Sequence, residues 1–252
     1  MDLGLSDRVY VVTGGTSGLG RAGAEALVDE GARVVVCARD QGRLDETIAA
    51  LGADCATGVA GDLADPALAD RLVEHASSTY GRLDGALLSV GGPPPGSVTD
   101  TGDDAWRAAF ESIFLGQLRC ARAVASALGE GGAIAFVLSS SVRSPIAGLA
   151  ASNGLRPGLA MAAKTLADEL GPRGIRVNGL LPGRVATERT KQLDAARGDE
   201  AAARAASEAL IPLRRYGDPA EFGRVAAFVL SPAASYLSGV MLPVDGGLLR
   251  TI

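Results

Sequence analysis

The sequence predicts a doubly wound α/β fold, in which helices flank one parallel β-sheet. Apolar runs rich in β-branched residues alternate with helical segments along almost the whole chain, as in parallel sheets with right-handed crossovers. These runs are continuously apolar, which is typical of strands buried on both faces. The chain has 252 residues, and no linker or low-complexity segment divides it. We therefore expect a single domain over residues 1–252.

The first half of the chain shows this alternation clearly. Residues 8–13 (RVYVVT) predict a strand, and the helix expected over 20–30 places Ala22, Ala26 and Leu27 on one face. The β-branched run at 32–38 (ARVVVCA) predicts the second strand. The same reasoning gives the other elements of this half: a helix over 44–51, a weak strand over 55–60, a helix over 67–80 and a strand over 85–89.

The second half continues the pattern and contains one irregular segment. The expected elements are a long helix over 105–128, a strand over 133–138, a helix over 155–170, a strand over 175–180, a helix over 219–230 and a strand over 240–244. Residues 184–215 are Ala-rich and charged and fit no strand. A segment of that length in a compact domain usually forms a lid or a binding insert. We expect a substrate lid at about 184–215, with a pair of surface helices as the alternative.

Composition and charge exclude several classes of protein. With 24 basic and 29 acidic side chains the formal charge is −5, which disfavours nucleic acid as a partner. No apolar run reaches the roughly 18 residues of a membrane span, and the N-terminus lacks a signal peptide, so a cytoplasmic location is expected. Cys37, Cys55 and Cys120 are too scattered for a disulfide framework. Since His75 is the only histidine, no His-rich metal site is expected.

A glycine-rich turn follows the first strand and opens the first helix. Glycines permit a tight turn and a close backbone approach to a pyrophosphate, while the helix N-terminus supplies N–H groups and a positive dipole end. The strand–turn–helix–strand context is the one that this Rossmann-type motif requires, so dinucleotide binding is favoured over a plain glycine-rich turn. The expected cofactor-binding residues of this segment (TGGTSGLG) are Thr13, Gly14, Thr16, Ser17, Gly18, Leu19 and Gly20.

The residues after the second strand indicate which dinucleotide binds. An acidic residue there would accept a hydrogen bond from the ribose 2′-hydroxyl of NAD. The sequence instead has Arg39, followed by Asp40. The planar guanidinium of Arg39 suits a 2′-phosphate, which favours NADP(H). Asp40 keeps NAD(H) open as the less favoured cofactor.

These motifs together resemble those of the short-chain dehydrogenase/reductase (SDR) family over essentially the whole chain. The resemblance rests on the TGxxxGxG turn, Asp62-Leu63, Gly81-Arg82-Leu83-Asp84, Pro182-Gly183 with Thr187, and Asp245-Gly246-Gly247. The pattern is most similar to that of 3-oxoacyl-carrier-protein reductases. It implies one seven-stranded Rossmann-type sheet, hydride transfer between nicotinamide and a carbonyl or alcohol carbon, a small-molecule substrate, and a homodimer or homotetramer. It adds Asp62, Leu63, Ser89, Gly91, Pro182, Gly183 and Thr187 to the expected cofactor-binding residues.

The resemblance fails at the catalytic positions. Counted back from residues 173–178 (RGIRVN), the family's Tyr and Lys of YxxxK fall on Ser152 and Arg156. Counted from Trp106 and Phe110, the usual Asn falls on Ile113. The catalytic Ser falls on Ser139, although the run of serines at 139–141 leaves open which one faces the substrate. The candidate catalytic residues are therefore Ser139, Ser152 and Arg156, with Arg156 also a candidate ligand of the cofactor ribose.

This departure leaves the chemistry open. A serine hydroxyl is a poor acid near neutral pH, and arginine stays protonated, so the usual proton relay cannot operate. The first hypothesis is an NADP(H)-dependent oxidoreductase whose proton comes from water, substrate or Ser152. The alternatives are a catalytically inactive NADP(H)-binding sensor or scaffold, and a non-redox lyase or isomerase. Among the tyrosines, Tyr216 is the one that follows the expected lid and is a candidate to reach the site.

Overall fold

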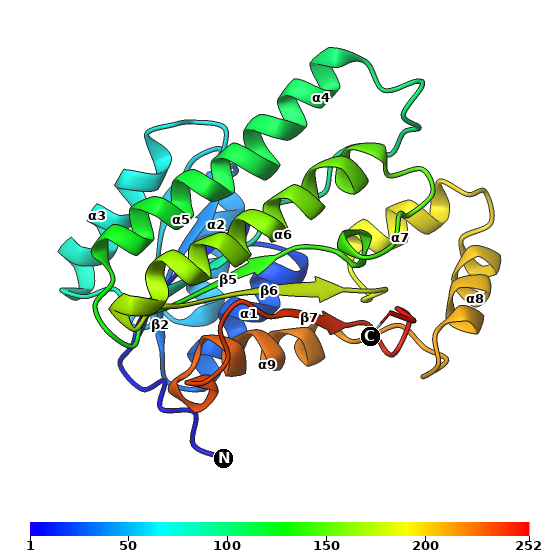
Figure 1. Cartoon of the computed structure of the whole chain (residues 1–252). Coiled ribbons are helices and arrows are strands. Elements are labelled where there is room, and N and C mark those ends of the chain that lie inside the picture. The colour runs from blue at the N-terminus through cyan, green and yellow to red at the C-terminus, as the bar shows by residue number, and fades with distance from the viewer. Residues whose placement is uncertain (252) are drawn as a thin grey trace.

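The protein is described by a computed structural model over residues 1–251. Within this range seven strands form one sheet in the order β3-β2-β1-β4-β5-β6-β7, and every neighbouring pair is parallel (Figure 1). This confirms the predicted fold class. The strands are β1 (Val9–Thr13), β2 (Arg33–Ala38), β3 (Ala56–Ala60), β4 (Gly85–Leu88), β5 (Ala133–Val137), β6 (Arg176–Pro182) and β7 (Met241–Val244).

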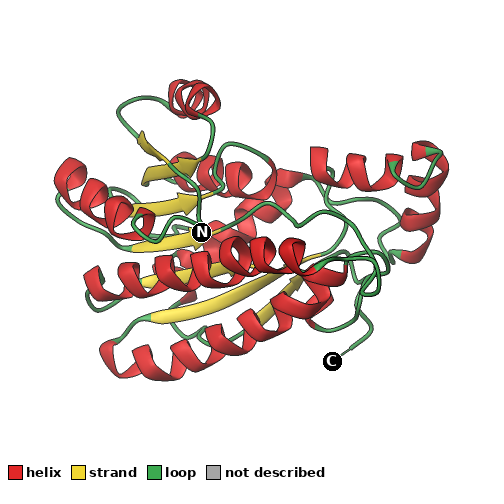
Figure 2. Ribbon diagram, turned by 90° about the horizontal axis from the view of Figure 1, so that it is seen from above, coloured by secondary structure: helices red, strands yellow, loops and turns green. Residues whose placement is uncertain are grey.

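Helices cover both faces of the sheet (Figure 2). One face carries α1 (Gly18–Asp29), α2 (Gln41–Leu51) and α9 (Pro219–Leu230). The other carries α3 (Leu68–Tyr80), α5 (Gly116–Ala127) and α6 (Ala150–Leu170), with α4 (Asp103–Ala109) leading into α5. None of the described helices has the length and apolarity needed to cross a membrane.

Each strand supplies both cores because its side chains alternate between the two faces. In β1, Val9 and Val11 belong to the core under α3, α5 and α6, whereas Tyr10 and Val12 belong to the core under α1, α2 and α9. All four side chains are fully buried. Burial on both sides explains why the strand sequences are continuously apolar.

The first helix packs closely against the last long one. At the crossing of α1 and α9, a Cβ placed on Gly223 would lie 2.3 Å from the carbonyl oxygen of Ala22. Only a residue without a side chain allows the two backbones to approach this closely. Phe222 and Ala226 of α9 and Leu27 of α1 fill the same core.

The structure corrects two of the expected helices and shows the conformation of the irregular segment. The helix expected from 155 is α6, which begins at Ala150 and contains Pro157 in its interior, although Gly154 and Pro157 both disfavour helix. The helix expected over 105–128 is divided by a π-helical segment, Phe110–Leu115. The irregular segment 184–215 contains two helices, α7 (Glu188–Ala195) and α8 (Glu200–Leu210).

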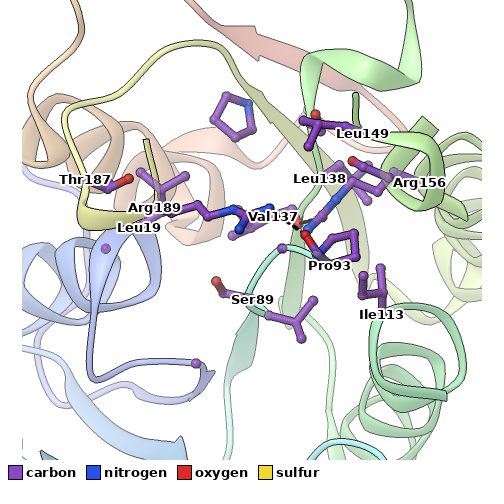
Figure 3. A pocket seen from close by; sticks show the side chains of 18 of the residues that line it. Leu19, Ser89, Pro93, Ile113, Val137, Leu138, Leu149, Arg156, Thr187 and Arg189 are labelled. Atoms are coloured by element: carbon purple, nitrogen blue, oxygen red, sulfur yellow. Dashed lines mark hydrogen bonds between the residues drawn. The ribbon is translucent and has the colours of Figure 1, made fainter. Parts of the chain in front are cut away.

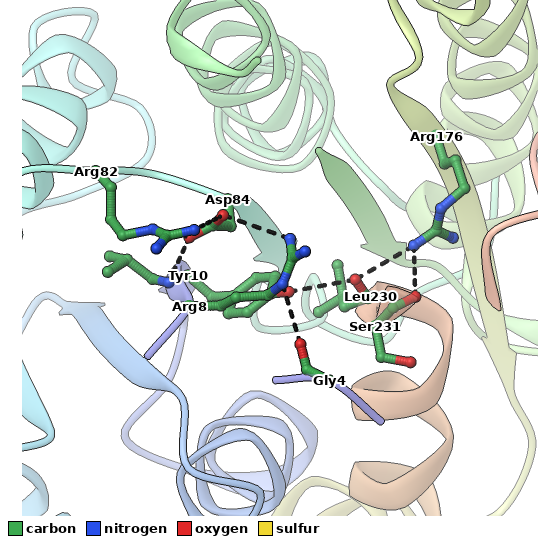
Figure 4. A network of polar contacts seen from close by, with 9 residues as sticks. Gly4, Arg8, Tyr10, Arg82, Asp84, Arg176, Leu230 and Ser231 are labelled. Carbon is green, nitrogen blue, oxygen red and sulfur yellow. Dashed lines mark hydrogen bonds and ion pairs between the residues drawn. The ribbon is translucent and has the colours of Figure 1, made fainter. Parts of the chain in front are cut away.

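A polar network fastens the amino ends of the strands (Figure 4). Asp84, just before β4, accepts hydrogen bonds from Arg82 at 2.8 and 2.7 Å and from the Val9 amide at 2.9 Å. Arg176, at the start of β6, donates to the carbonyls of Val229 and Ser231 at 2.8 and 2.9 Å. These contacts join β1, β4 and β6 to the end of α9. The network is structural, because it lies at the opposite ends of the strands from the cleft described below.

Candidate active site

A cleft of about 1320 Å³ lies along the carboxyl ends of the strands, where open α/β sheets bind their ligands. It brings together residues from the glycine-rich turn, the ends of β2, β4, β5 and β6, and helices α6 and α7. The predicted site residues that line it are Gly14, Thr16, Ser17, Gly18, Leu19, Arg39, Asp62, Leu63, Ser89, Gly91, Ser139, Ser152, Arg156, Pro182, Gly183 and Thr187. Thr13 and Gly20 do not line the cleft and instead support its walls.

Thr13 and Gly20 hold the glycine-rich turn in place. The Thr13 hydroxyl donates to the Ser89 carbonyl at 2.7 Å and accepts from the Ser89 amide at 2.8 Å, which joins the ends of β1 and β4. A Cβ on Gly20 would lie 2.3 Å from the carbonyl oxygen of Gly14, so the turn closes only with glycine there. Gly14 itself has a φ of +57°, which glycine adopts without strain.

The residues that open α1, Gly18 and Leu19, line the cleft beside this turn. The helix begins at Gly18, and the Ser17 side chain makes no capping hydrogen bond. The first N–H groups of a helix have no partner within the helix, and they carry the positive end of its dipole. Together with the short Ser17 and Thr16 side chains, they form a donor set that fits a pyrophosphate.

Arg39 stands at the far end of the cleft. Its side chain is 82% exposed and lies 3.9 Å from the Asp62 carboxylate, too far for a strong constraint. The neighbouring Asp40 is the N-cap of α2, and its carboxylate accepts from the Arg43 amide at 2.9 Å. Asp40 therefore has a structural partner, while the Arg39 guanidinium stays available for a ligand.

Three serines meet at the end of β5. The Ser139 hydroxyl accepts from the Ser141 amide at 3.1 Å, and the hydroxyls of Ser141 and Ser152 are 3.2 Å apart. Ser139, Ser140 and Ser152 line the cleft, whereas Ser141 does not. The loop after β5 and the helix α6 thus both present serine residues to a ligand.

Two arginines extend into the cleft from opposite sides (Figure 3). Arg156 of α6 is 5% exposed and donates to the Val137 carbonyl at 2.8 Å. Burial, with a smaller contribution from the Arg189 charge, lowers the pKa of Arg156 to about 10. Arg189 of α7 donates to the Pro93 carbonyl, and burial lowers its pKa.

Sequence reasoning missed Arg189, although a signal was present. The residue lies in the first turn of α7, two positions after Thr187. Acidic side chains are favoured at helix N-termini because they complement the dipole, and a basic residue there is unfavourable. A basic residue in this position, within the segment expected to cover the cleft, points to a ligand.

No tyrosine, lysine or histidine lines the cleft, as far as the structure describes the chain. The Tyr216 hydroxyl donates to the buried Asp194 carboxylate at 2.8 Å, so this tyrosine fastens α7 instead of reaching the site. Tyr10 lies in the core, where burial raises its pKa to about 12. The His75 ring lies 2.9 Å from the Thr57 hydroxyl, between α3 and β3, and Lys164 is exposed.

The cleft therefore combines a glycine-rich wall that could hold a dinucleotide with an unusual set of polar side chains. Its hydroxyl and guanidinium groups can donate hydrogen bonds to a carbonyl oxygen. Cys37 also lines the cleft, and burial raises the pKa of its thiol to about 12. Ser139, Ser152 and Arg156 can polarise and orient a ligand, but none is an effective proton donor at neutral pH.

Comparison with known proteins agrees with this geometry. A family model described as enoyl-(acyl carrier protein) reductase matches residues 14–249. An uncharacterized oxidoreductase of Mycobacterium tuberculosis is 34% identical over 249 residues, which are 96% of this chain and 92% of the relative. The human dehydrogenase/reductase SDR family member 4 is 31% identical over 255 residues, with 96% and 88% covered.

Solved structures match over the whole length. The L-sorbose reductase from Gluconobacter frateurii, solved with NADPH and L-sorbose, has a TM-score of 0.93 and 31% identity, with 100% of both chains covered. A single-substitution variant of the actinorhodin polyketide ketoreductase, solved with NADPH, has a TM-score of 0.90 and 28% identity, covering 97% of this chain and 98% of the other.

Proposed function

The chain belongs to the short-chain dehydrogenase/reductase family of oxidoreductases, and we propose that it is an NADP(H)-dependent enzyme that interconverts a carbonyl and an alcohol through an atypical proton relay. The observation that carries this proposal is that the groups expected to hold the cofactor are all present in the cleft. The turn at Gly14, the uncapped amides of α1 and the Arg39 guanidinium lie in one continuous cleft.

NADP(H) is proposed over NAD(H) because of the charges at the end of β2. Arg39 is free to bind a 2′-phosphate, while the carboxylate of Asp40 is engaged in capping α2. A hydrogen bond to a charged group contributes about 1.5–3 kcal/mol. The L-sorbose reductase and the polyketide ketoreductase were both solved with NADPH, which supports the same choice.

When bound, NADPH supplies the hydride. In our proposal, Ser139 and Ser152 donate hydrogen bonds to the substrate oxygen and hold the carbonyl carbon in line for reduction. Because Arg156 stays largely protonated at neutral pH, it orients a ligand and does not shuttle a proton. The proton then reaches the product oxygen through Ser152, from water or from a group of the substrate itself.

The proposal is tested by titrating the protein with NADPH and with NADH while following Trp106 fluorescence. We expect NADPH to bind more tightly, and Arg39→Ala to weaken NADPH binding about 10- to 100-fold with little effect on NADH. Arg33→Ala is a matched control, because Arg33 begins the same strand at its opposite end and pairs with Asp7. Equal binding of both nucleotides by the unmodified protein would contradict the NADP assignment.

A second candidate function follows from the missing general acid. A protein that binds NADP(H) as a sensor or scaffold needs the groups that hold the cofactor, but it needs no proton donor. This fits the observation that no tyrosine lines the described part of the cleft. Transfer of deuterium from 4-deuterated NADPH to a carbonyl substrate discriminates the two functions. Incorporation supports the oxidoreductase, whereas tight NADPH binding with no incorporation from a broad carbonyl panel supports the sensor.

The remaining parts of the proposal concern the lid, assembly and location. We propose that 184–215 acts as the substrate lid, because Arg189 and Leu193 of α7 and Ser207 and Leu210 of α8 line the cleft. A homodimer or homotetramer is proposed from family resemblance, supported by the exposed Met161 on α6. The cytoplasmic location stays a prediction from the sequence.

A further inference from the structure

Arg156 and Arg189 both line the cleft and form a pair of guanidinium groups there. Arg156 comes from α6 and Arg189 from α7, and Figure 3 shows both side chains extending toward Val137 and Pro93. Their hydrogen-bond partners are two backbone carbonyls, those of Val137 and Pro93. Each guanidinium has five N–H donors, so most of the donors of this arginine pair are left for a ligand.

The charges of the arginine pair are not neutralised by the protein. Within residues 1–251 neither guanidinium forms an ion pair. The charge acting on Arg156 is that of Arg189, which has the same sign. Buried charges are normally paired, because removing an ion from water is costly. Two like charges held together in a cleft therefore suit an anionic ligand.

The acidic side chains that line the cleft lie away from the arginine pair. Asp40 caps α2, Asp62 lies beside Arg39, and Glu111 pairs with Arg119 at 3.1 Å. Glu188 is exposed at the start of α7. None of these carboxylates is within ion-pair distance of the arginine pair, so the negative charge has to come with a ligand.

The phosphates of the cofactor have their own donors at other places in the cleft. The pyrophosphate fits the uncapped amides of α1 next to Leu19, and the 2′-phosphate fits Arg39. In Figure 3, Arg189 starts near Leu19 and Thr187, but its guanidinium points away from both, toward Val137. Arg156 enters from the opposite side, next to Leu138 and Leu149. The arginine pair thus faces the substrate side of the cleft.

We propose that the substrate carries an anionic oxygen group, a carboxylate or a phosphate, that binds between Arg156 and Arg189 while its carbonyl lies against Ser139 and Ser152. This inference rests on the proposed function and specifies its substrate class. Two guanidinium groups that converge from different helices suit the several oxygens of such a group. Binding of the anion would also fix α7, the helix that carries Arg189, over the cleft.

The experiment compares matched carbonyl compounds that differ in charge. The probes are 4-oxopentanoate with its methyl ester, and dihydroxyacetone phosphate with dihydroxyacetone. Binding to the protein saturated with NADP⁺, which cannot reduce the probes, is measured by calorimetry, and NADPH oxidation is followed separately by absorbance. We expect the anionic member of at least one pair to bind 10-fold or more tightly than its neutral partner. The pair that shows this preference distinguishes a carboxylate from a phosphate.

Variants then locate the preference. Arg189→Gln should reduce the anion preference about 10- to 100-fold, and Arg156→Lys, which keeps the charge but loses the fork, should retain part of it. The control is Arg122→Gln on the outer side of α5, where an exposed arginine is removed away from the cleft. NADPH affinity should be unchanged in the Arg189→Gln variant. Because Arg189 is half-buried, this position tolerates substitution better than that of Arg156 does.

Three results would overturn the inference. Equal binding of all charged and neutral probes, or a preference that survives Arg189→Gln, would show that the arginine pair does not select the substrate. A loss of NADPH affinity in Arg189→Gln as large as the loss of anion affinity would assign the pair to the cofactor. Failure of the proposed function looks different: anions would still bind in calorimetry, but NADPH would not be oxidised with any probe.

Discussion

At the scale of single residues, Arg156 shows how the site differs from an ordinary protein interior. Its side chain is 5% exposed and has one carbonyl partner, so the folded protein holds an incompletely compensated charge. Such groups persist where function requires them, and stability is lost in return. Even with a pKa of about 10, the group is almost fully protonated at pH 7.

This cost predicts that Arg156→Met stabilises the unliganded protein. Methionine fills a similar volume without a charge. Replacing buried charged groups by apolar residues can raise the free energy of unfolding by roughly 1–4 kcal/mol. We expect an increase of about 1–2 kcal/mol here, because the Val137 carbonyl loses its donor. Urea unfolding at pH 7 measures the change. A variant less stable than the unmodified protein would show that the guanidinium is well compensated.

The difference in stability between Arg156→Met and the unmodified protein should also depend on pH, which gives a second measurement. Because the folded-state pKa of Arg156 is about 10, below its usual value of 12.5, the unfolded state binds more protons between these two pH values. The unmodified protein therefore gains stability as pH rises above about 10. The extra stability of Arg156→Met over the unmodified protein should therefore decrease above about pH 10 and stay constant below pH 9.

At the scale of elements, the sequence identified the strands and the glycine-rich turn well. Continuous apolar runs marked strands such as β1 and β2, since both faces of the sheet are buried. The start of α6 was missed because Gly154 and Pro157 have poor helix propensity. Tertiary contacts override it: the Asn153 side chain bonds the Ile146 amide and carbonyl at 3.0 and 2.9 Å and fixes the entry into the helix.

The site was predicted unevenly for a related reason. The expected cofactor-binding residues follow a local motif, such as that of 13–20, and the motif specifies its own geometry. Arg189 lies 33 positions from Arg156 in the chain (189 − 156), and only the packing of α7 beside the ends of the strands brings the two together. Convergence of residues from different elements depends on tertiary structure, which no local pattern encodes.

The contact between α1 and α9 predicts a sharp difference between two glycine substitutions. Gly223→Ala places a Cβ 2.3 Å from the Ala22 carbonyl oxygen, a backbone atom that cannot rotate away, so we expect a loss of about 1–3 kcal/mol. Gly102→Ser, at the N-cap of α4 with extended backbone angles and no atom within 4 Å, should be neutral or stabilising by about 0.4–1 kcal/mol. Thermal unfolding of both variants checks this, and equal effects would contradict the close packing.

At the scale of the whole molecule, the candidate ligand cleft and the contacts that maintain the fold lie at opposite ends of the strands. The cleft lies at the carboxyl ends of the strands, while the Asp84 and Arg176 contacts fasten the amino ends. Such a division lets the loops over the cleft vary without removing the contacts that hold the sheet to its helices.

A dinucleotide that binds only the folded state should stabilise the whole molecule. At a concentration 100 times its dissociation constant, a ligand adds about 2.7 kcal/mol. For a chain of this size, we expect NADPH to raise the melting temperature by about 5–10 °C, and NADH at the same concentration to raise it less. Differential scanning calorimetry makes the measurement, with Arg39→Ala as the variant that should lose the difference. No shift with either nucleotide would contradict cofactor binding.

The packing of α1 against α9 also bears on how the protein is made. The ribosome releases α1 early, yet Leu27 shares its core with Phe222 and Ala226, which are synthesised nearly two hundred residues later. Until then the inner face of α1 has no permanent cover, and the nascent chain exposes apolar surface to other nascent chains and to chaperones. Completion of this sheet face is therefore a post-translational event. Fragments that stop short of residue 219 should aggregate, and adding the missing segment separately should rescue them.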